Sequence, residues 1–418
     1  MNILHVSQNY FPSPGGPQYT MKHVSEKLVA SYGDNVQVCT TNSMYGPETR
    51  LFKKINPAVE TIGNVEVNRL PFRRWHYPFI ELAGKVYGKV TGKALPPSIT
   101  RHRWELDSPE IDKMMDKSNA DVIMATTIIY HFSDYPLWRI KTKNPKPFVL
   151  YGAIHLHKPL PENSPLIRRA KACDSYIANT EFERKELIKY GVQEEKICTI
   201  GTGIELNDFI VSAESKDAFR LENGVKDSDI LIGFIGRLVK GKGVAILIEA
   251  FRKLYAEDKN VKLLLAGGTT DYVPEIRKVI AEEKLPILLI ENFNDELKSL
   301  LYHALDIFVL ASQSESFGVV FLEAWACKKP VVGAKMGAIE SLLSEGDDSL
   351  LFEPGNADSL RACLQTLMAN EELRKRFGRN GYQKVVDHYT WERIVAKYRE
   401  AYLLGIENFK SYFPKRSF

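Results

Sequence analysis

The stretch that decides the fold is Ser314-Glu315-Ser316-Phe317-Gly318-Val319-Val320-Phe321-Leu322-Glu323-Ala324, which follows the apolar run 304–311. The run predicts a buried parallel strand, and the residues after Gly318 predict a helix that begins after a short polar turn. Such a turn presents backbone N–H groups and the positive end of a helix dipole to an anion. Glu315 falls in the turn and Glu323 on the helix. Carboxylates beside an anion site suit a ligand that also carries hydroxyls, and a nucleotide sugar has both groups.

Size and composition bound the class of protein. A chain of 418 residues exceeds what one core usually serves, so we expect two domains. The apolar fraction of 44% is ordinary for a globular protein, and no apolar run is long enough to cross a membrane. The start, 1–7, lacks the basic and apolar segments of a signal peptide. Five scattered cysteines without metal-like pairs fit a reducing compartment, so we expect a cytoplasmic protein.

One region, residues 50–103, is strongly basic. It holds eleven Lys and Arg residues against three Glu, and the aromatic residues Phe72, Trp75, Tyr77 and Phe79 lie among them. This mixture favours peripheral contact with the inner face of an anionic membrane, or binding of an anionic acceptor. The alternative is a solvated face around a long loop, with the aromatic residues packed into the local core. We do not expect nucleic-acid binding.

Apolar runs alternate with helical patterns along the chain, which predicts α/β architecture with parallel sheets. In the first half we expect helices at 19–32 and 181–190, the second capped by Thr180 with acidic residues in its first turn. The strands expected in that half are 3–7, 36–40, 65–70, 122–125, 148–151, 176–178 and 197–200.

A second α/β series begins at residue 230. Its expected strands are 230–235, 261–266, 287–290, 307–311 and 331–333. We place the hinge between the series at 202–209 and the polar stretch 211–216. The tail 391–404 predicts one more helix, and Phe409, Tyr412 and Phe413 are apolar enough to dock on the body of the protein.

The second series opens with Gly233-Phe234-Ile235-Gly236-Arg237-Leu238-Val239-Lys240-Gly241-Lys242-Gly243. A strand ends here in a glycine turn that carries Arg237 and Lys242, and both cations suit phosphate oxygens. The turn almost matches a P-loop, but Gly243 stands where that loop needs a Ser or Thr hydroxyl for magnesium. We therefore reject a P-loop nucleotide hydrolase.

Other loops at strand ends supply weaker signals. Gly15 and Gly16 would let a backbone approach a ligand closely, although a plain connecting loop is the common explanation. Gly267 follows the strand 261–266 in the same way. His155 and His157 follow the strand 148–151, where one of them could contact a bound sugar. A zinc pair is conceivable, but no third ligand has supporting spacing, so we expect no metal.

A second metal-like pattern is Asp227-Ser228-Asp229, which has the form that magnesium-dependent sugar transferases use. It precedes the strand 230–235 and so lies at the wrong edge of the sheet for a ligand. We interpret it as a solvated turn.

Taken together, these motifs resemble the retaining glycosyltransferases of family GT4. The most specific element is Glu315-x7-Glu323, which continues to Val332. The family's Gly-Arg-Leu element begins here at Gly236, and its Lys-Gly element begins at Lys242. The family's linker pattern matches residues 196–204, and its amino-terminal pattern matches residues 10–16. The resemblance covers nearly the whole chain and implies the GT-B fold, in which two Rossmann-like domains face a central cleft. It implies an N-terminal acceptor domain (1–205), a C-terminal donor domain (206–390) and a crossover helix with its tail on the first domain (391–418).

The resemblance also implies roles for individual residues. Arg237 and Lys242 would bind the donor pyrophosphate, and Glu323 would accept hydrogen bonds from the ribose. Glu315 and the N–H groups of Ser316, Phe317, Gly318 and Val319 would hold the transferred sugar. Gly15, Gly16 and Gly267 would line the nucleotide-sugar site. His155 fits the family's acceptor-side histidine best, with His157 as the second choice, and Glu315, His155, Arg237 and Lys242 form the expected catalytic set.

Two segments depart from the family. Lys328 and Lys329 precede Pro330 where members often have Cys-Gly-x-Pro, and the Gly-Gly-Ile-Pro-Glu stretch appears as Gly337-Ala338-Ile339-Glu340-Ser341. Both segments lie at the edge of the predicted pocket, so they bear on donor details and not on the class.

The implied reaction moves a hexose or N-acetylhexosamine from UDP- or, less favoured, GDP-sugar to an acceptor hydroxyl, as in glycan, polysaccharide or glycolipid synthesis. It retains the anomeric configuration and needs no metal or other cofactor. Fixed positive charge stabilises the leaving diphosphate, and a phosphate oxygen takes the acceptor's proton in front-face attack. Two alternatives stay open: a disaccharide synthase or phosphorylase on the same fold, and a non-catalytic nucleotide-sugar-binding protein. The sequence does not name the sugar, the base, the acceptor or the oligomeric state.

Overall fold

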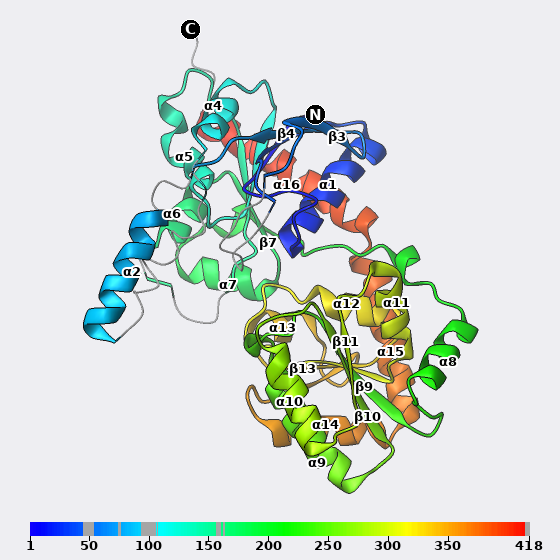
Figure 1. Cartoon of the computed structure of the whole chain (residues 1–418). Helices are drawn as coiled ribbons and strands as arrows, with labels where there is room; N and C mark the ends of the chain where they lie inside the picture. Colours follow the sequence, from blue (N-terminus) through cyan, green and yellow to red (C-terminus); the bar gives the residue numbers. More distant parts are fainter. Residues whose placement is uncertain are drawn as a thin grey trace.

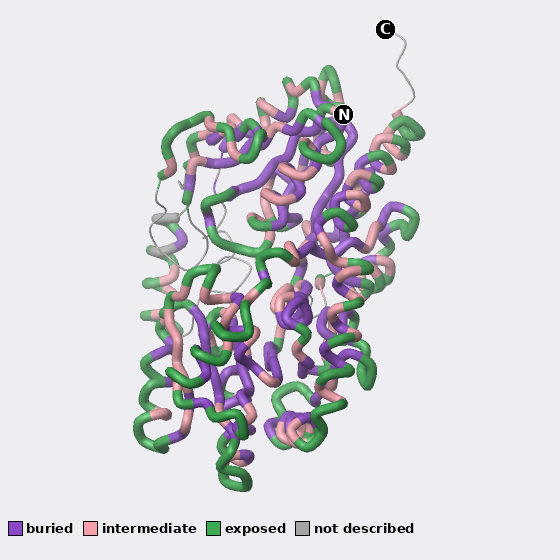
Figure 2. The backbone as a smooth tube through the Cα atoms, turned by 90° about the vertical axis from the view of Figure 1, so that its right-hand side faces the viewer, coloured by how far each residue is buried: buried purple, intermediate pink, exposed green. Residues whose placement is uncertain are grey.

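The computed structural model describes residues 1–44, 54–73, 77–92, 106, 108–155, 160–161 and 164–413. They form two α/β domains, one above the other in Figure 1, each built on its own sheet. In Figure 2 the buried segments run through the middle of each domain and exposed segments surround them. The expected α/β fold with two parallel-sheet domains is confirmed. Among the described helices, none combines the length and the apolar character needed to cross a bilayer.

The N-terminal sheet has the order β3-β4-β2-β1-β5-β6-β7-β8. Neighbouring strands are parallel except β3, which pairs antiparallel with β4. The strands are β1 (Asn2–Ser7), β2 (Asn35–Thr41), β3 (Val59–Ile62), β4 (Val65–Leu70), β5 (Val122–Thr126), β6 (Phe148–Tyr151), β7 (Ser175–Ala178) and β8 (Ile197–Thr199).

Helices cover both faces of this sheet, so its central strands are buried and read as continuous apolar runs. One core lies between the sheet, α1 (Gly16–Tyr32) and the last helix, α16 (Trp391–Tyr412). The other lies under α4 (Pro109–Lys117), α5 (Tyr135–Trp138), α6 (Pro165–Ala172) and α7 (Glu181–Lys189). Helix α2 (Tyr77–Thr91) extends outward from the domain (Figure 1).

The C-terminal sheet is parallel, with the order β11-β10-β9-β12-β13-β14. Its strands are β9 (Ile230–Ile235), β10 (Val261–Gly267), β11 (Ile287–Glu291), β12 (Ile307–Leu310), β13 (Val331–Ala334) and β14 (Ser349–Phe352). Its helices are α8 (Ala213–Glu222), α9 (Val244–Glu257), α10 (Val273–Glu283), α11 (Asp295–Ala304), α12 (Val319–Ala326), α13 (Gly337–Leu342), α14 (Ala357–Met368) and α15 (Glu371–His388). This is the doubly wound strand order, which reverses between β9 and β12.

The chain crosses between the domains twice, and the two crossings lie together. The N–H of Ile204 donates to the carbonyl of Tyr389 at 2.9 Å, and Ile204 forms a parallel bridge with Thr390. Lys27 of α1 contacts both crossings, since its Nζ lies 3.1 Å from Glu205 and 2.8 Å from Glu392. The domain boundaries expected from the sequence, 205/206 and 390/391, lie within two residues of this pair.

Helix α16 returns from the second crossing to the N-terminal domain, where it packs on α1, β5, β6 and β7. Trp391 at its start is fully buried and stacks on His23, with ring centroids 4.7 Å apart. Gly203 of the first crossing lies against the Trp391 ring so closely that a Cβ would come within 2.6 Å of it. The expected crossover helix is confirmed, and it runs to Tyr412, beyond the expected end at 404.

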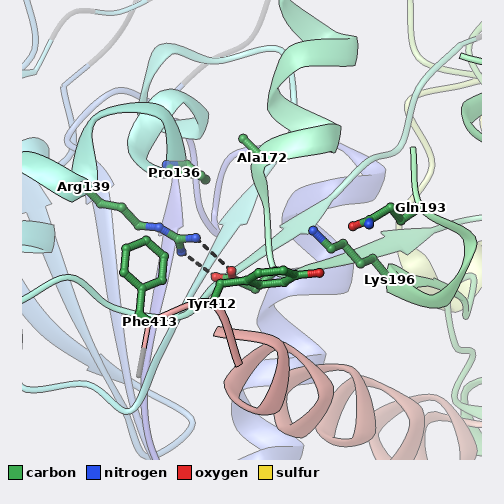
Figure 3. Close-up of a pocket in the computed structure, with 8 residues that line it drawn as sticks. Pro136, Arg139, Ala172, Gln193, Lys196, Tyr412 and Phe413 are labelled. Carbon is green, nitrogen blue, oxygen red and sulfur yellow. Dashed lines mark hydrogen bonds and ion pairs between the residues drawn. The ribbon is translucent and has the colours of Figure 1, made fainter. Parts of the chain in front are cut away.

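The aromatic end of α16 docks on the domain as expected. Phe409 and Phe413 stack on each other, and both lie over the Arg139 guanidinium, at 5.0 and 5.4 Å. Arg139 is paired with Asp174, and Lys196 lies over the Tyr412 ring at 4.9 Å. These residues line a cavity of about 300 Å³, in which Figure 3 shows Arg139, Lys196 and Tyr412. This cavity is lined by α5, α6 and the end of α16, and none of the residues predicted for the donor site lines it.

The structure corrects some details of the predicted elements. The antiparallel strand β3 was not expected; it forms a hairpin with β4 through Gly63 and Asn64, both at positive φ. Strand β14 was also missed. Part of the polar stretch 211–216 belongs to α8 and not to a hinge, because Ser212 caps this helix by accepting from the Ser215 N–H.

We predict that Trp391→Ala lowers the free energy of unfolding by about 3–5 kcal/mol, because it leaves a cavity where α16 begins. Leu403→Ala, on the exposed side of the same helix, is the matched control and should change the free energy by less than about 0.5 kcal/mol. Urea denaturation followed by circular dichroism measures both values. Equal effects of the two substitutions would contradict the importance of this contact.

Candidate active site

The two charged loops of the C-terminal domain follow β9 and β12, the neighbouring strands between which the strand order reverses. Ligands of open α/β sheets bind outside the carboxyl ends of the strands at such a point. The turn with Arg237 and Lys242 follows β9, and the turn with Glu315 follows β12. The fold therefore brings together residues that are more than seventy positions apart in the sequence.

Gly243 allows the two loops to touch. It has a φ of +75°, and a Cβ on it would lie 1.9 Å from the carbonyl oxygen of Ala311. The Gln313 N–H donates to the carbonyl of Gly241 at 3.2 Å, and the Ser312 hydroxyl contacts the same oxygen at 3.4 Å. Close backbone packing explains the glycine that stands where a P-loop would have a hydroxyl.

Lys242 and Glu315 form an ion pair across these loops, with Nζ and Oε1 2.5 Å apart. Their side chains are 19% and 10% exposed, so the pair is shielded but reachable from solvent. Both residues were predicted to bind parts of one ligand, and the structure places them in direct contact. A phosphate near Lys242 and a sugar hydroxyl near Glu315 would then belong to neighbouring parts of the same molecule.

The start of α12 lies next to this pair. Gly318 is its N-cap residue at a φ of +96°, and in the described structure no side chain caps the helix. Phe317 is buried and packs edge-on against Tyr389 at the domain crossing, with ring centroids 5.7 Å apart. The loop that carries Ser316 to Val319 is therefore anchored beside the hinge, with its N–H groups at the positive end of the helix.

Glu323 lies one turn into α12 and is held by two side chains of α11. It accepts from the Tyr302 hydroxyl at 2.6 Å and from Lys298 Nζ at 3.2 Å. A carboxylate has about four acceptor positions, so about two are left beyond these contacts. The sequence analysis missed Lys298 and Tyr302, although their spacing of four residues on a helix places them on one face.

The Glu323 carboxylate also raises the pKa values of the two side chains that hold it. Burial and the adjacent Glu323 carboxylate raise the pKa of Tyr302 well above its usual value. Burial alone would lower the pKa of Lys298, but Glu323 and Asp295 outweigh it and the pKa is raised. Tyr302 therefore remains a hydrogen-bond donor to Glu323, and Lys298 remains a cation.

Arg237 and Gly267 lie at the same edge of the sheet. Arg237 is exposed in the loop after β9. Gly267 ends β10, and a Cβ on it would lie 2.0 Å from the carbonyl oxygen of Gly236. Its lack of a side chain is required by the approach of these two backbones, whether or not it also contacts a ligand.

The N-terminal domain contributes three of the predicted residues at its own sheet edge, Gly15, Gly16 and His155. Gly15 is the N-cap residue of α1 at a φ of +142°. Gly16 begins α1, and a Cβ on it would meet no described atom within 4 Å. His155 follows β6, and its Nδ1 lies 3.2 Å from the hydroxyl of Ser314 in the opposite domain. The loop that carries His155 thus meets the loop of Glu315. His157 lies outside the described residues.

The described residues contain no group of three or more metal-ligating side chains. Asp229 of the Asp227–Asp229 pattern accepts from the Lys226 N–H at 2.9 Å and is buried, so the interpretation of this turn as fully solvated is wrong for that residue.

Two family models match the sequence almost end to end. The model of Glycosyltransferase Family 4 matches residues 14–208, and the model of Glycosyl transferases group 1 matches residues 215–384. The chain belongs to this glycosyltransferase family.

Curated glycosyltransferases are similar to this chain over somewhat more than half of its length. The capsular polysaccharide biosynthesis glycosyltransferase CapM of Staphylococcus aureus is 27% identical over 237 residues, which is 54% of this chain and 61% of CapM. A D-inositol 3-phosphate glycosyltransferase of Geodermatophilus obscurus is 28% identical over 245 residues, 56% of this chain and 53% of the relative. The chain thus spans between about a half and three-fifths of the length of these relatives.

Solved structures show that this family member has the GT-B fold. HepE of Anabaena, solved in complex with UDP, superposes with a TM-score of 0.71 at 20% identity, covering 96% of this chain and 99% of HepE. At this identity the likeness concerns the fold, and the roles of single residues rest on the geometry described above.

One further residue of this glycosyltransferase supports the His155 loop. Glu183 of α7 is buried under that loop, where it accepts from the Tyr176 hydroxyl at 2.6 Å, from the Asn179 N–H at 2.9 Å and from the backbone of Ile154. Burial raises its pKa to about 7 although these hydrogen bonds lower it. The sequence indicated only an acidic residue in the first turn of a helix.

We predict that Glu183 makes stability depend on pH. Since its pKa is about 7 in the folded state and near 4.5 when unfolded, the folded state binds the proton more tightly. Its contribution is fully present below about pH 4.5 and is lost as the pH rises through about 7, by up to about 3 kcal/mol.

Glu183→Gln imitates the protonated carboxyl and should remove the pH-dependent contribution of this residue to the free energy of unfolding. The test compares urea midpoints of the wild type and the variant at pH 5 and pH 8. The urea midpoint of the variant relative to that of the wild type should be higher at pH 8 than at pH 5. A difference in midpoint that is the same at both pH values would show that Glu183 does not cause the pH dependence.

Proposed function

We propose that this chain transfers a hexose or N-acetylhexosamine from a nucleoside-diphosphate sugar to an acceptor hydroxyl, with retention of configuration and without a metal. The observation that carries the proposal is the Lys242–Glu315 pair at the point of strand-order reversal, next to the uncapped start of α12. A phosphate-binding cation and a hydroxyl-binding carboxylate in contact fit the two ends of a sugar–phosphate bond.

Each predicted residue has a place in this reaction. Lys242 and Arg237 neutralise the departing diphosphate, and the start of α12 adds the positive end of its dipole. Glu323, oriented by Tyr302 and Lys298, accepts from the ribose. Glu315 and the N–H groups of residues 316–319 hold the sugar.

The N-terminal domain supplies the other side of the reaction. His155 contacts the acceptor from across the domain boundary, and Gly16 leaves room for a phosphate at the start of α1. Closure of the domains excludes water, so the acceptor hydroxyl is the nucleophile that reaches the sugar. A phosphate oxygen of the donor takes its proton in front-face attack.

UDP is the favoured carrier, because the similar fold of HepE is solved with UDP and with UDP-glucose. The acceptor is a glycan or a lipid-linked saccharide, in line with the capsular polysaccharide role in the name of CapM and with the basic region 50–103. A cytoplasmic location with peripheral contact at the membrane would suit such an acceptor.

We expect one nucleoside diphosphate among UDP, GDP and ADP to stabilise the protein against heat. At about a hundred times its dissociation constant it should add roughly 2.7 kcal/mol to the domain that binds it. Lys242→Ala should abolish the effect. Lys240→Ala is the matched control, because Lys240 lies two residues away but points to Glu275 in an exposed pair. Loss of the shift in both variants, or in neither, would contradict the assigned role of Lys242.

We also expect slow hydrolysis of UDP-glucose to release α-glucose first, as seen by proton NMR before mutarotation, and to persist in EDTA. Glu315→Gln should lower this rate by about a hundredfold, because it removes a charged hydrogen-bond partner of the sugar. Release of β-glucose would refute retention, and rapid transfer to phosphate or to a free sugar would favour the phosphorylase or disaccharide synthase alternative. Firm binding of UDP with no turnover would favour a non-catalytic protein.

A further inference from the structure

Helix α2 carries a row of exposed apolar side chains. Phe79, Leu82, Val86 and Val90 are 69%, 62%, 56% and 78% exposed. At about 100° per residue, their spacing places all four within a sector of about 80°. Large apolar residues that are exposed singly are common, but a continuous row of four on one helix is not.

The opposite side of the helix faces the protein. Ile80 is buried, and Gly84, Tyr87 and Gly88 are partly buried. Their spacing places them on the side away from the apolar row. Helix α2 is therefore attached to the domain along one face, and it extends outward from it (Figure 1) while it presents the apolar row to the surroundings.

Positive charge accompanies the row. Lys85 and Lys89 are exposed, and the helical spacing places Lys89 directly beside the position of Leu82, with Lys85 next to it. Arg73, shortly before the helix, is also exposed, and the surrounding sequence 50–103 has eleven basic residues against three acidic ones. Outside this region the charges nearly balance, with 45 basic against 49 acidic residues.

We propose that α2 docks this protein on an anionic lipid surface, with the row Phe79, Leu82, Val86 and Val90 inserted at the level of the lipid headgroups. An amphipathic helix with lysines beside a narrow apolar face binds at such an interface in its plane. The row is convex and one helix wide, so it offers no groove to a folded partner, whereas a bilayer adapts to it. The exposure of Phe79 argues against the alternative in which the aromatic residues of this region all pack into the local core.

This proposal is independent of sugar transfer, because α2 contains none of the residues assigned to the donor site. It also gives the proposed reaction a location, because a protein held by α2 would meet a lipid-linked acceptor at the membrane surface.

The test is co-sedimentation of the full chain with vesicles of phosphatidylcholine that contain phosphatidylglycerol, and with vesicles of phosphatidylcholine alone. We expect binding to the anionic vesicles that weakens as salt is raised, and little binding to the neutral ones. Lys85→Gln with Lys89→Gln should lower the partition coefficient about thirtyfold, because each lysine near an anionic surface contributes on the order of 1 kcal/mol.

Leu82→Glu with Val86→Glu should abolish vesicle binding. The matched control is Ile210→Glu with Leu221→Glu, at two apolar positions of the C-terminal domain that are 76% and 80% exposed. It changes the net charge by the same amount as the α2 variant, and it should bind anionic vesicles nearly as well as the wild type. Circular dichroism and the UDP-induced thermal shift confirm that each variant is folded, and they separate a failure of docking from a failure of the donor site.

Three outcomes would overturn the proposal. They are the absence of binding to anionic vesicles, equal losses in the α2 variant and its control, and self-association of the wild type that Leu82→Glu with Val86→Glu removes while vesicles are not bound. The last result would assign the row to contact between two copies of the chain.

Discussion

The two chain crossings between the domains are held together, and the position of the N-terminal site residues relative to the C-terminal ones depends on this contact. The hydrogen bond from Ile204 to Tyr389 ties the crossings side by side, and Lys27 binds a carboxylate on each of them. Because α16 then packs across the N-terminal sheet, the C-terminal domain is joined to the N-terminal core by a buried tryptophan as well as by the linker. The loops of the two domains meet because this joint sets their orientation.

Within the C-terminal domain, a comparable constraint is the contact between the loops after β9 and β12. Gly243 permits an approach that any side chain would block, and the Lys242–Glu315 pair bridges the same loops. The local sequence resembles a P-loop because both structures place a cation after a strand in a glycine turn. They differ in the residue that follows, and here that residue serves backbone packing.

The sequence allowed prediction of the elements that are buried on both sides, because their apolar runs are continuous. Strands β6 and β9 begin and end at the expected residues. Strand β4 does so as well, although it alternates between buried and more exposed residues. Strand β3 is different: Val59-Glu60-Thr61-Ile62 is short and largely exposed, so its pattern is weak, although Gly63-Asn64 is a turn signal. The motif residues of the site could be predicted one by one, while their contacts could not. Nothing in the spacing shows that Lys242 reaches Glu315, that α11 holds Glu323, or that Glu183 turns inward to support the His155 loop.

Away from the paired crossings, the described parts of the two domains meet through contacts between neutral polar groups and through the Phe182 ring, which lies against Gly337. His155 lies 3.2 Å from the Ser314 hydroxyl, and the Phe182 N–H donates to the Ser341 hydroxyl at 3.1 Å, where α7 meets α13. Each such bond is worth about 1 kcal/mol net, because water replaces it when the domains part. Opening at this contact therefore leaves both hydrophobic cores intact. Separation of the domains by rotation about the joint belongs to the time scale of domain motions and requires no local unfolding.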